Sequence, residues 1–187
     1  MANPTQATRK LPLDGRLAGG AGVSITPAAS MSRVSLRVKD KDVKAVGKAL
    51  CVALPIKPKT SNMSGDQAGA SRSALWIGPD EWLILDGETA DISAALAKSK
   101  AVMSVVDISH RNTAILLEGK NAVDVLRAGC PQNLNDDVFP VGACSRTILG
   151  KAEVVIWRTG AVSYHVECWR SFSGYVFKFM SQAAKGL

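Results

Sequence analysis

Residues 33–51 read Arg-Val-Ser-Leu-Arg-Val-Lys-Asp-Lys-Asp-Val-Lys-Ala-Val-Gly-Lys-Ala-Leu-Cys, and this stretch decides the fold. Polar and apolar residues alternate over its first six positions, which predicts a strand with one buried face. Val43, Val46 and Leu50 then recur at helical spacing. The stretch therefore predicts a strand followed directly by an amphipathic helix near 41–53.

The same pattern returns 79 positions later along the chain. At this offset Leu36 corresponds to Ile115 and Cys51 corresponds to Cys130. The residues between them again alternate and then take up helical spacing, which predicts a second strand and a helix near 120–129. A shared offset at strand, helix and cysteine indicates an internal repeat.

A hairpin and a further helix complete each repeat. Residues 75–85 hold two apolar runs around Gly-Pro-Asp, which is typical of a β-hairpin. At the offset of 79, Leu75 falls on Val154, inside another apolar run. The amphipathic segment at 91–98 falls on 170–177, which keeps helical spacing.

Two β-α-β-β-α units are therefore expected, joined by an apolar strand at 102–108. Units of this kind bury one sheet face against helices, which predicts an α+β fold. The chain is expected to begin with a flexible leader over 1–32, which is rich in Ala, Gly, Pro, Ser and Thr. The first unit, together with the linking strand, is expected over 33–108, and the second unit over 109–187.

Composition and charge exclude several classes of protein. Of 187 residues 47% are hydrophobic and 21% charged, which is ordinary for a globular chain. No apolar run suits a membrane helix or a secretory signal, so a soluble intracellular chain is expected. Residues 1–72 hold 12 Lys and Arg against 4 Asp and Glu. Because residues 1–74 contain no aromatic ring that could stack on a base, we expect this basic half to face solvent or an acidic protein rather than nucleic acid.

The four cysteines are predicted to be free thiols. A chain of this length can bury a sufficient core without disulfides, and no export signal is evident. Metal sites need several converging ligands, whereas the closest His and Cys here are His165 and Cys168, alone in a strand-like run. No metal site is expected.

No segment carries an established catalytic or nucleotide-binding motif. Asp107, Ser109 and His110 follow an apolar strand, but neighbouring residues of a strand point to opposite faces, so a turn is favoured over a catalytic dyad. The glycines over 15–22 lack both the dinucleotide spacing and a preceding strand. The sequence therefore predicts no catalytic residue and no cofactor-binding residue in this chain.

Several separate segments, in order, resemble the gamma-subunit family of heterotetrameric sarcosine oxidase. They span much of the chain from about 75 to 180, and they are residues 75–85, 106–113, 129–131, 139–147 and 166–172. The resemblance implies a bacterial cytoplasmic complex with alpha, beta and delta subunits as partners. That complex would oxidise sarcosine to glycine and produce hydrogen peroxide together with formaldehyde or methylenetetrahydrofolate. FAD, FMN, NAD and tetrahydrofolate are then implied for the partner subunits and not for this chain.

The gamma family also resembles, more distantly, the folate-binding domain of the aminomethyltransferases. Those enzymes carry an acidic pair after a Gly-rich turn. Here the comparable stretch is Gly150-Lys151-Ala152-Glu153, so Ala152 stands where the first acid is expected and only Glu153 remains. This resemblance implies the fold, while the missing acid disfavours an independent folate transferase.

A non-catalytic subunit must act through contacts, and interface energy concentrates in a few Trp and Arg anchors. Within the resemblance the candidates are Trp82, Arg111, Arg146, Trp169 and Arg170. The tryptophans could equally be core residues. The alternative functions are a stand-alone folate-binding, aminomethyltransferase-like protein and a basic nucleic-acid-binding module.

Overall fold

The computed structural model describes residues 10–20, 22–64, 72–97 and 99–187. Within these residues the strands form two antiparallel sheets. The first, in spatial order, comprises β4 (Ser61–Met63), β5 (Ser73–Gly78), β6 (Glu81–Gly87), β3 (Met31–Val38) and β7 (Met103–Asp107). The second comprises β1 (Ala18–Gly20), β2 (Val23–Pro27), β8 (Asn112–Glu118), β11 (Ser163–Trp169), β10 (Ala152–Arg158) and β9 (Cys144–Leu149).

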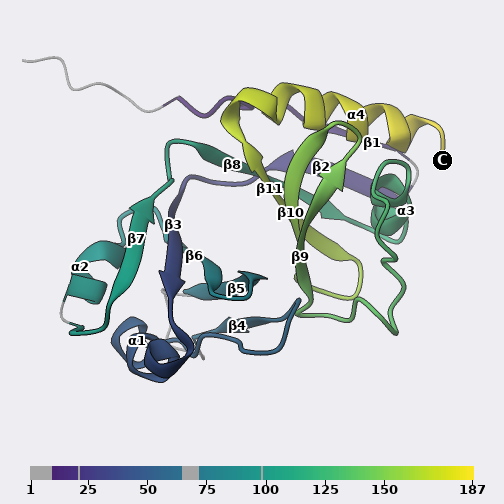
Figure 1. The fold of residues 1–187 in the computed structure, drawn as a ribbon. Coiled ribbons are helices and arrows are strands. Elements are labelled where there is room, and N and C mark those ends of the chain that lie inside the picture. The colour runs from purple at the N-terminus through teal and green to yellow at the C-terminus, as the bar shows by residue number, and fades with distance from the viewer. Residues whose placement is uncertain (1–9, 21, 65–71, 98) are drawn as a thin grey trace, which may run out of the picture.

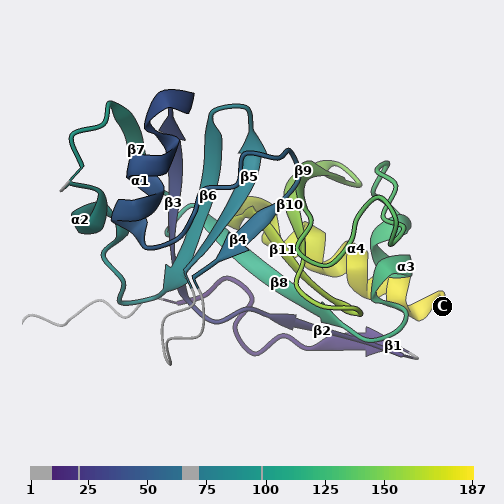
Figure 2. The ribbon, with the colours of Figure 1, turned by 90° about the horizontal axis from the view of Figure 1, so that it is seen from below.

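Helices cover the outer face of each sheet. Figure 2 shows the pair α1 and α2 on one side of the molecule and α3 and α4 on the other, with the two sheets between them. Their bounds are α1 (Val43–Leu50), α2 (Ile92–Ala97), α3 (Ala122–Arg127) and α4 (Ser173–Lys185), with 3-10 turns at Asp40–Asp42 and Arg170–Phe172. The observed architecture is mixed α+β, as the sequence predicts, and Figure 1 labels its elements.

Each outer face packs through a separate apolar core. Val46 of α1 and Leu36 of β3 are fully buried beneath the first helix pair, and Val125 and Ile115 occupy the corresponding places beneath the second. A third, smaller core lies between the sheets and contains Leu75, Leu83, Leu85, Ile108, Cys144, Val155 and Trp157. Strands β6 and β10, which contribute to the third core, are thus buried on both faces.

The predicted β-α-β-β-α pattern omits one strand from each half. β4 lies beside β5 at one end of the first sheet, and β9 lies beside β10 at the end of the second. The predicted linking strand is β7, which pairs antiparallel with β3 instead of standing between the units. A three-residue strand such as β4 has too few positions for a period to show in sequence, which explains its omission.

The register predicted by the offset of 79 holds in one place and is wrong in another. Leu36 and Ile115 both face helices, as the offset requires. Leu75, however, faces the other sheet, whereas Val154 faces helices, and Val155 is the residue that lies between the sheets. Because side chains alternate along a strand, a slip of one residue exchanges the two faces.

The predicted leader over 1–32 is wrong for the residues that the structure describes. Both β1 and β2 lie inside it, and Leu13 and Ile25 are fully buried in the second sheet's core. β2 gains its stability by pairing with β8, a partner far along the chain, so its short Val-Ser-Ile-Thr alternation gave little local signal. Residues 1–9 lie outside the described part of the chain.

All four cysteines are free thiols, as predicted, but their environments differ. Burial raises the pKa of Cys144 and of Cys168 to about 12, whereas Cys51 is exposed at the end of α1. Since the thiolate is the reactive form, we expect iodoacetamide at pH 8 to modify Cys51 at least about tenfold faster than the buried thiols. Peptide mass spectrometry of the native chain tests this, and the Cys51→Ser variant should lose the rapid phase.

Candidate functional site

A buried ion pair joins the two sheets. Arg33 of β3 and Glu167 of β11 are 2% and 1% exposed, and the Arg33 Nε lies 2.9 and 2.8 Å from the two carboxylate oxygens. The Nε2 of His165 lies 2.8 Å from Oε1 of the same carboxylate. A carboxylate with three short contacts and almost no exposure is held in one geometry, so this network fixes how β3 meets β11.

The ionised state of Glu167 depends on these partners. Burial by itself would raise the pKa of the Glu167 carboxyl, but the hydrogen bond and charge of His165 and the charge of Arg33 outweigh it and hold the pKa below its ordinary 4.5. A depressed folded-state pKa means that the network stabilises the fold fully above about pH 4.5 and loses its contribution as the pH falls through the lower, folded value.

The polar cluster after β7 serves the same junction. The Oγ of Ser109 accepts a hydrogen bond from the Arg33 backbone N–H at 2.8 Å and lies 3.3 Å from the Arg33 carbonyl oxygen. The Ser109 N–H in turn donates to Asp107 at 2.8 Å. The cluster is therefore a turn that holds β3, as favoured over a catalytic dyad.

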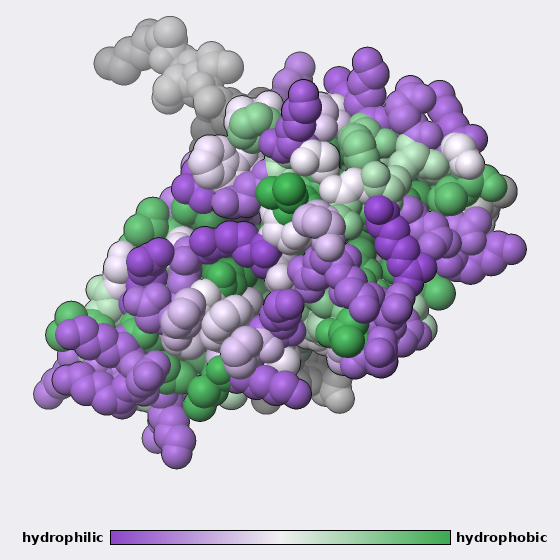
Figure 3. Space-filling view, turned by 45° about the vertical axis from the view of Figure 1, so that its right-hand side comes forward, coloured by the Kyte–Doolittle hydropathy of each residue, from purple (hydrophilic) through white to green (hydrophobic). Residues whose placement is uncertain are grey.

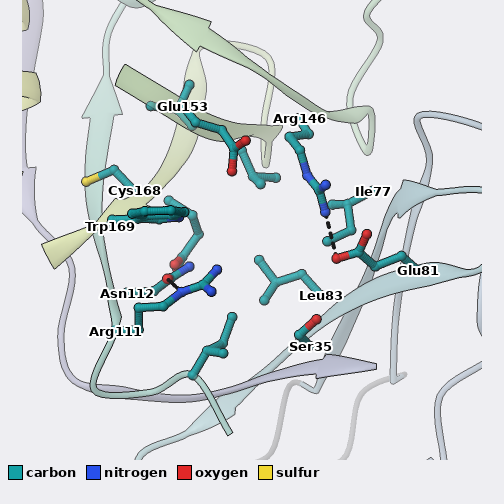
Figure 4. Close-up of a pocket in the computed structure, with 14 residues that line it drawn as sticks. Ser35, Ile77, Glu81, Leu83, Arg111, Asn112, Arg146, Glu153, Cys168 and Trp169 are labelled. Carbon is teal, nitrogen blue, oxygen red and sulfur yellow. Dashed lines mark hydrogen bonds and ion pairs between the residues drawn. The ribbon is translucent and has the colours of Figure 1, made fainter. Parts of the chain in front are cut away.

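Charged and aromatic side chains line the open end of the space between the sheets. The guanidinium of Arg111 lies 4.9 Å from the centre of the Trp169 ring, a cation–π contact. Arg146 of β9 forms an ion pair of 2.7 Å with Glu81 of β6, and so links the two sheets a second time. Figure 4 shows these groups and Glu153 around one hollow. The hollow has a volume of about 40 Å³.

This cavity does not fit a folate or a dinucleotide. Sites for molecules of drug size measure roughly 300–1,000 Å³, whereas about 40 Å³ has room for only a few water molecules. Ala152, at the place of the first acid in the aminomethyltransferase pattern, is 1% exposed and lies in the core beneath α3 and α4. Only Glu153, on the opposite face of β10, reaches the cavity. No reaction step is assigned to these residues.

The structure brings three of the five predicted interface residues together. Arg111, Arg146 and Trp169 all line the cavity mouth, and Trp169 is 39% exposed. Arg170 follows Trp169 directly, and its backbone N–H donates to the Arg111 carbonyl at 2.7 Å. Its guanidinium lies outside this group and donates to the Lys10 carbonyl at 2.8 Å.

Trp82, one of the five predicted interface anchors, lies in a core and not on the surface. It is 1% exposed, packs in the core beneath α1 and α2, and donates from Nε1 to the Pro55 carbonyl at 2.8 Å. β6 is apolar on both faces, so its sequence does not reveal which side of the strand Trp82 occupies.

Partly exposed apolar side chains lie next to residues that line the cavity. Phe172 packs at 6.1 Å from Trp169 and is 43% exposed. Ile148 and Val106, on the inward-facing sides of β9 and β7, are about half exposed. Figure 3 shows that on the face in view hydrophobic residues form separate patches among hydrophilic ones rather than one continuous apolar surface.

The network between the sheets escaped sequence reasoning. Arg33 and Glu167 are 134 positions apart, and each stands in a strand that alternates normally. The sequence shows a charged residue on a strand face that also carries apolar residues, but this pattern does not identify the residue with which the charge pairs.

Comparisons with known proteins agree with this architecture. The family model of the sarcosine oxidase gamma subunit matches residues 39–186. The gamma subunit of sarcosine oxidase from Corynebacterium sp. (strain U-96) is 27% identical over 169 residues, which cover 89% of this chain and 82% of that relative.

Two solved structures share the fold. A chain of heterotetrameric sarcosine oxidase from Corynebacterium sp. U-96, in complex with pyrrole 2-carboxylate, aligns over 94% of both chains with a TM-score of 0.79 and 27% identity. Aminomethyltransferase T of the glycine cleavage system from Bartonella henselae aligns over 87% of this chain and 46% of its own, with a TM-score of 0.62 and 14% identity, a likeness of fold alone. From the family match over most of its length, the chain belongs to the sarcosine oxidase gamma-subunit family.

Proposed function

We propose that the chain is the gamma subunit of a heterotetrameric sarcosine oxidase and contributes structure instead of catalysis. The observation that carries this proposal is the alignment over 94% of both chains with a subunit of that complex. The partners are then alpha, beta and delta subunits in the cytoplasm, and those partners hold FAD, FMN, NAD and tetrahydrofolate. The complex converts sarcosine to glycine.

The described polar groups support a structural role. The side chains of Arg33 and His165 both contact the buried Glu167 carboxylate, and the cavity beside that carboxylate is about 40 Å³. A catalytic site usually offers a concave pocket with polar groups aimed at a substrate. The groups here are aimed at each other and join the two sheets.

The surface around Trp169 is the proposed contact with a partner subunit. We name it the Trp169 surface, comprising Arg111, Arg146, Trp169, Arg170 and Phe172. Its rings and guanidiniums are exposed, yet the Arg111–Trp169 contact already orders two of them in the free chain. Ordering before binding reduces the entropy lost on association, which suits an anchor.

Co-expression with the three partner subunits tests the assignment. We expect the chain to co-purify in equal amounts with them and the complex to oxidise sarcosine. Isolated chain that binds tetrahydrofolate in calorimetry and fails to assemble would contradict the proposal and support the folate-binding alternative.

The Trp169→Ala variant tests the contact itself. We expect it to weaken assembly by about 2 kcal/mol, or roughly thirtyfold in Kd, because Trp anchors often dominate an interface. The matched control is Tyr175→Ala, which removes a ring of similar exposure, 40% against 39%, from helix α4. Thermal melts of both free variants show whether they are folded. Equal assembly by wild type and Trp169→Ala would remove the Trp169 surface from the interface.

A further inference from the structure

An apolar groove runs along helix α1 on the outer side of the first sheet, away from the Trp169 surface. It has a volume of about 480 Å³, within the range of ligand-binding sites. Helix α1 forms one wall and the segment 51–56 forms the other. The lining residues are Val43, Lys44, Gly47, Lys48, Cys51, Val52, Ala53, Leu54 and Ile56.

The second wall is held in place by hydrogen bonds. Nε1 of Trp82 donates to the Pro55 carbonyl at 2.8 Å, and the Asn62 side chain donates to the Ala53 carbonyl at 2.9 Å. The segment also passes close to Gly47, where an added Cβ would lie 3.1 Å from the Val52 carbonyl oxygen. The groove is therefore formed before anything binds.

The groove exposes apolar surface that folding alone does not require. Ile56 at its edge is 74% exposed, although the residues on its floor, Val52 and Leu54, are buried. The exposed Ile56 side chain adds apolar surface at the rim of the preformed groove, so an occupant of the groove would bury both.

Positive charge surrounds the groove. Lys44 and Lys48 line it, and Lys41, Lys57 and Lys59 are exposed close by in the sequence. Within the part of the chain that the structure describes, no ion pair joins any of these five lysines to a carboxylate. Unpaired lysines beside an apolar groove favour an occupant that has carboxylates next to aliphatic side chains.

We propose that this groove docks an acidic amphipathic helix of another protein chain. Aliphatic side chains at i, i+3, i+4 and i+7 fill the space against Gly47 and Leu54, and carboxylates beside them meet Lys44 and Lys48. None of the described residues that line the groove is aromatic, which disfavours single-stranded nucleic acid. The proposal goes beyond subunit assembly, because it concerns a different surface.

The experiment uses the full chain and a fluorescein-labelled peptide of about 18 residues, with Leu at the four helical positions and Glu on the flanking face. We expect anisotropy to show saturable binding, at least about tenfold tighter than that of a scrambled peptide of equal composition. The same peptide should slow alkylation of Cys51, which lines the groove.

Two pairs of variants show whether peptide binding depends on the groove or only on the overall positive charge of the chain. The double variant Lys44→Glu/Lys48→Glu should weaken peptide binding at least about tenfold. The control double variant Lys151→Glu/Lys178→Glu makes an equal charge change on the second unit and should alter peptide binding less than about twofold. Ile56→Asp should also weaken it, and Val162→Asp, at an exposed position near β11, should not.

Equal loss in both charge variants, or equal binding of the scrambled peptide, would overturn the proposal. So would binding to phosphatidylserine vesicles or duplex DNA without binding to the peptide. Assembly with the partner subunits is measured separately, so failure here leaves the proposed function standing.

Discussion

Glu167→Ala should lower the free energy of unfolding by about 3–5 kcal/mol at pH 7, because it leaves a buried charge without its partner. The Arg33 side chain is 2% exposed, and its Nε has the Glu167 carboxylate as its partner. Because the guanidinium is almost fully buried, its desolvation cost is no longer offset once the carboxylate is removed. Urea unfolding followed by circular dichroism measures the change.

Two further variants show whether the loss of stability in Glu167→Ala comes from the missing charge or from the missing side-chain volume. Glu153→Ala removes an exposed carboxylate from the neighbouring strand and should change stability by less than about 0.5 kcal/mol. Arg33→Met combined with Glu167→Leu should restore part of the loss, because the buried guanidinium is removed together with its carboxylate while His165 still lacks its partner. If Glu167→Ala unfolds at the wild-type urea midpoint, the network does not join the sheets as described.

Trp82→Ala should cost about 3–5 kcal/mol, the usual range for removal of a large buried aromatic ring. The variant leaves a cavity beneath α1 and α2, and it also leaves the Pro55 carbonyl without the Nε1 donor at 2.8 Å. The matched comparison is Trp169→Ala, which should cost less than about 1 kcal/mol because that ring is 39% exposed. Thermal melts of the two free variants measure both losses of stability.

The comparison also decides between the two interpretations of the tryptophans. A Trp82→Ala chain that melts like wild type but assembles poorly would make Trp82 an interface anchor after all. The structure predicts the reverse, in which Trp82→Ala fails through unfolding and Trp169→Ala fails through assembly.

Local patterns in the sequence predicted local structure well. The alternation and helical spacing over 33–51 place β3 and α1, and the Gly-Pro-Asp turn places the β5–β6 hairpin. In each case the residues that set the pattern are also the residues that pack, so periodicity and structure coincide. The α+β class follows from these elements alone.

Features that depend on distant partners could not be predicted. β6 is buried on both faces, with Trp82 toward the helices and Leu83 toward the other sheet. Polar and apolar residues therefore do not alternate along it, and its sequence does not show which residues face the helices. The pairing of Arg33 with Glu167 depends on where two separate strands meet. Exposure was easier to predict for Arg111, Trp169 and Arg170, because these residues lie at turns and strand ends, where exposure is common.

The pairing of β2 with β8 has a consequence for synthesis of the chain. Ser24 lies opposite Glu118, and 94 positions separate them, so β2, which the ribosome makes early, has only the three-residue β1 as a partner until β8 is made. At the usual 5–20 residues per second, that interval is about 5–20 s. The first sheet can close from residues 31–107 in this time, whereas the second sheet waits for both its earliest and its latest strands. During that wait the nascent β2 segment, with Val23 and Ile25 uncovered, is where chaperones have most reason to bind.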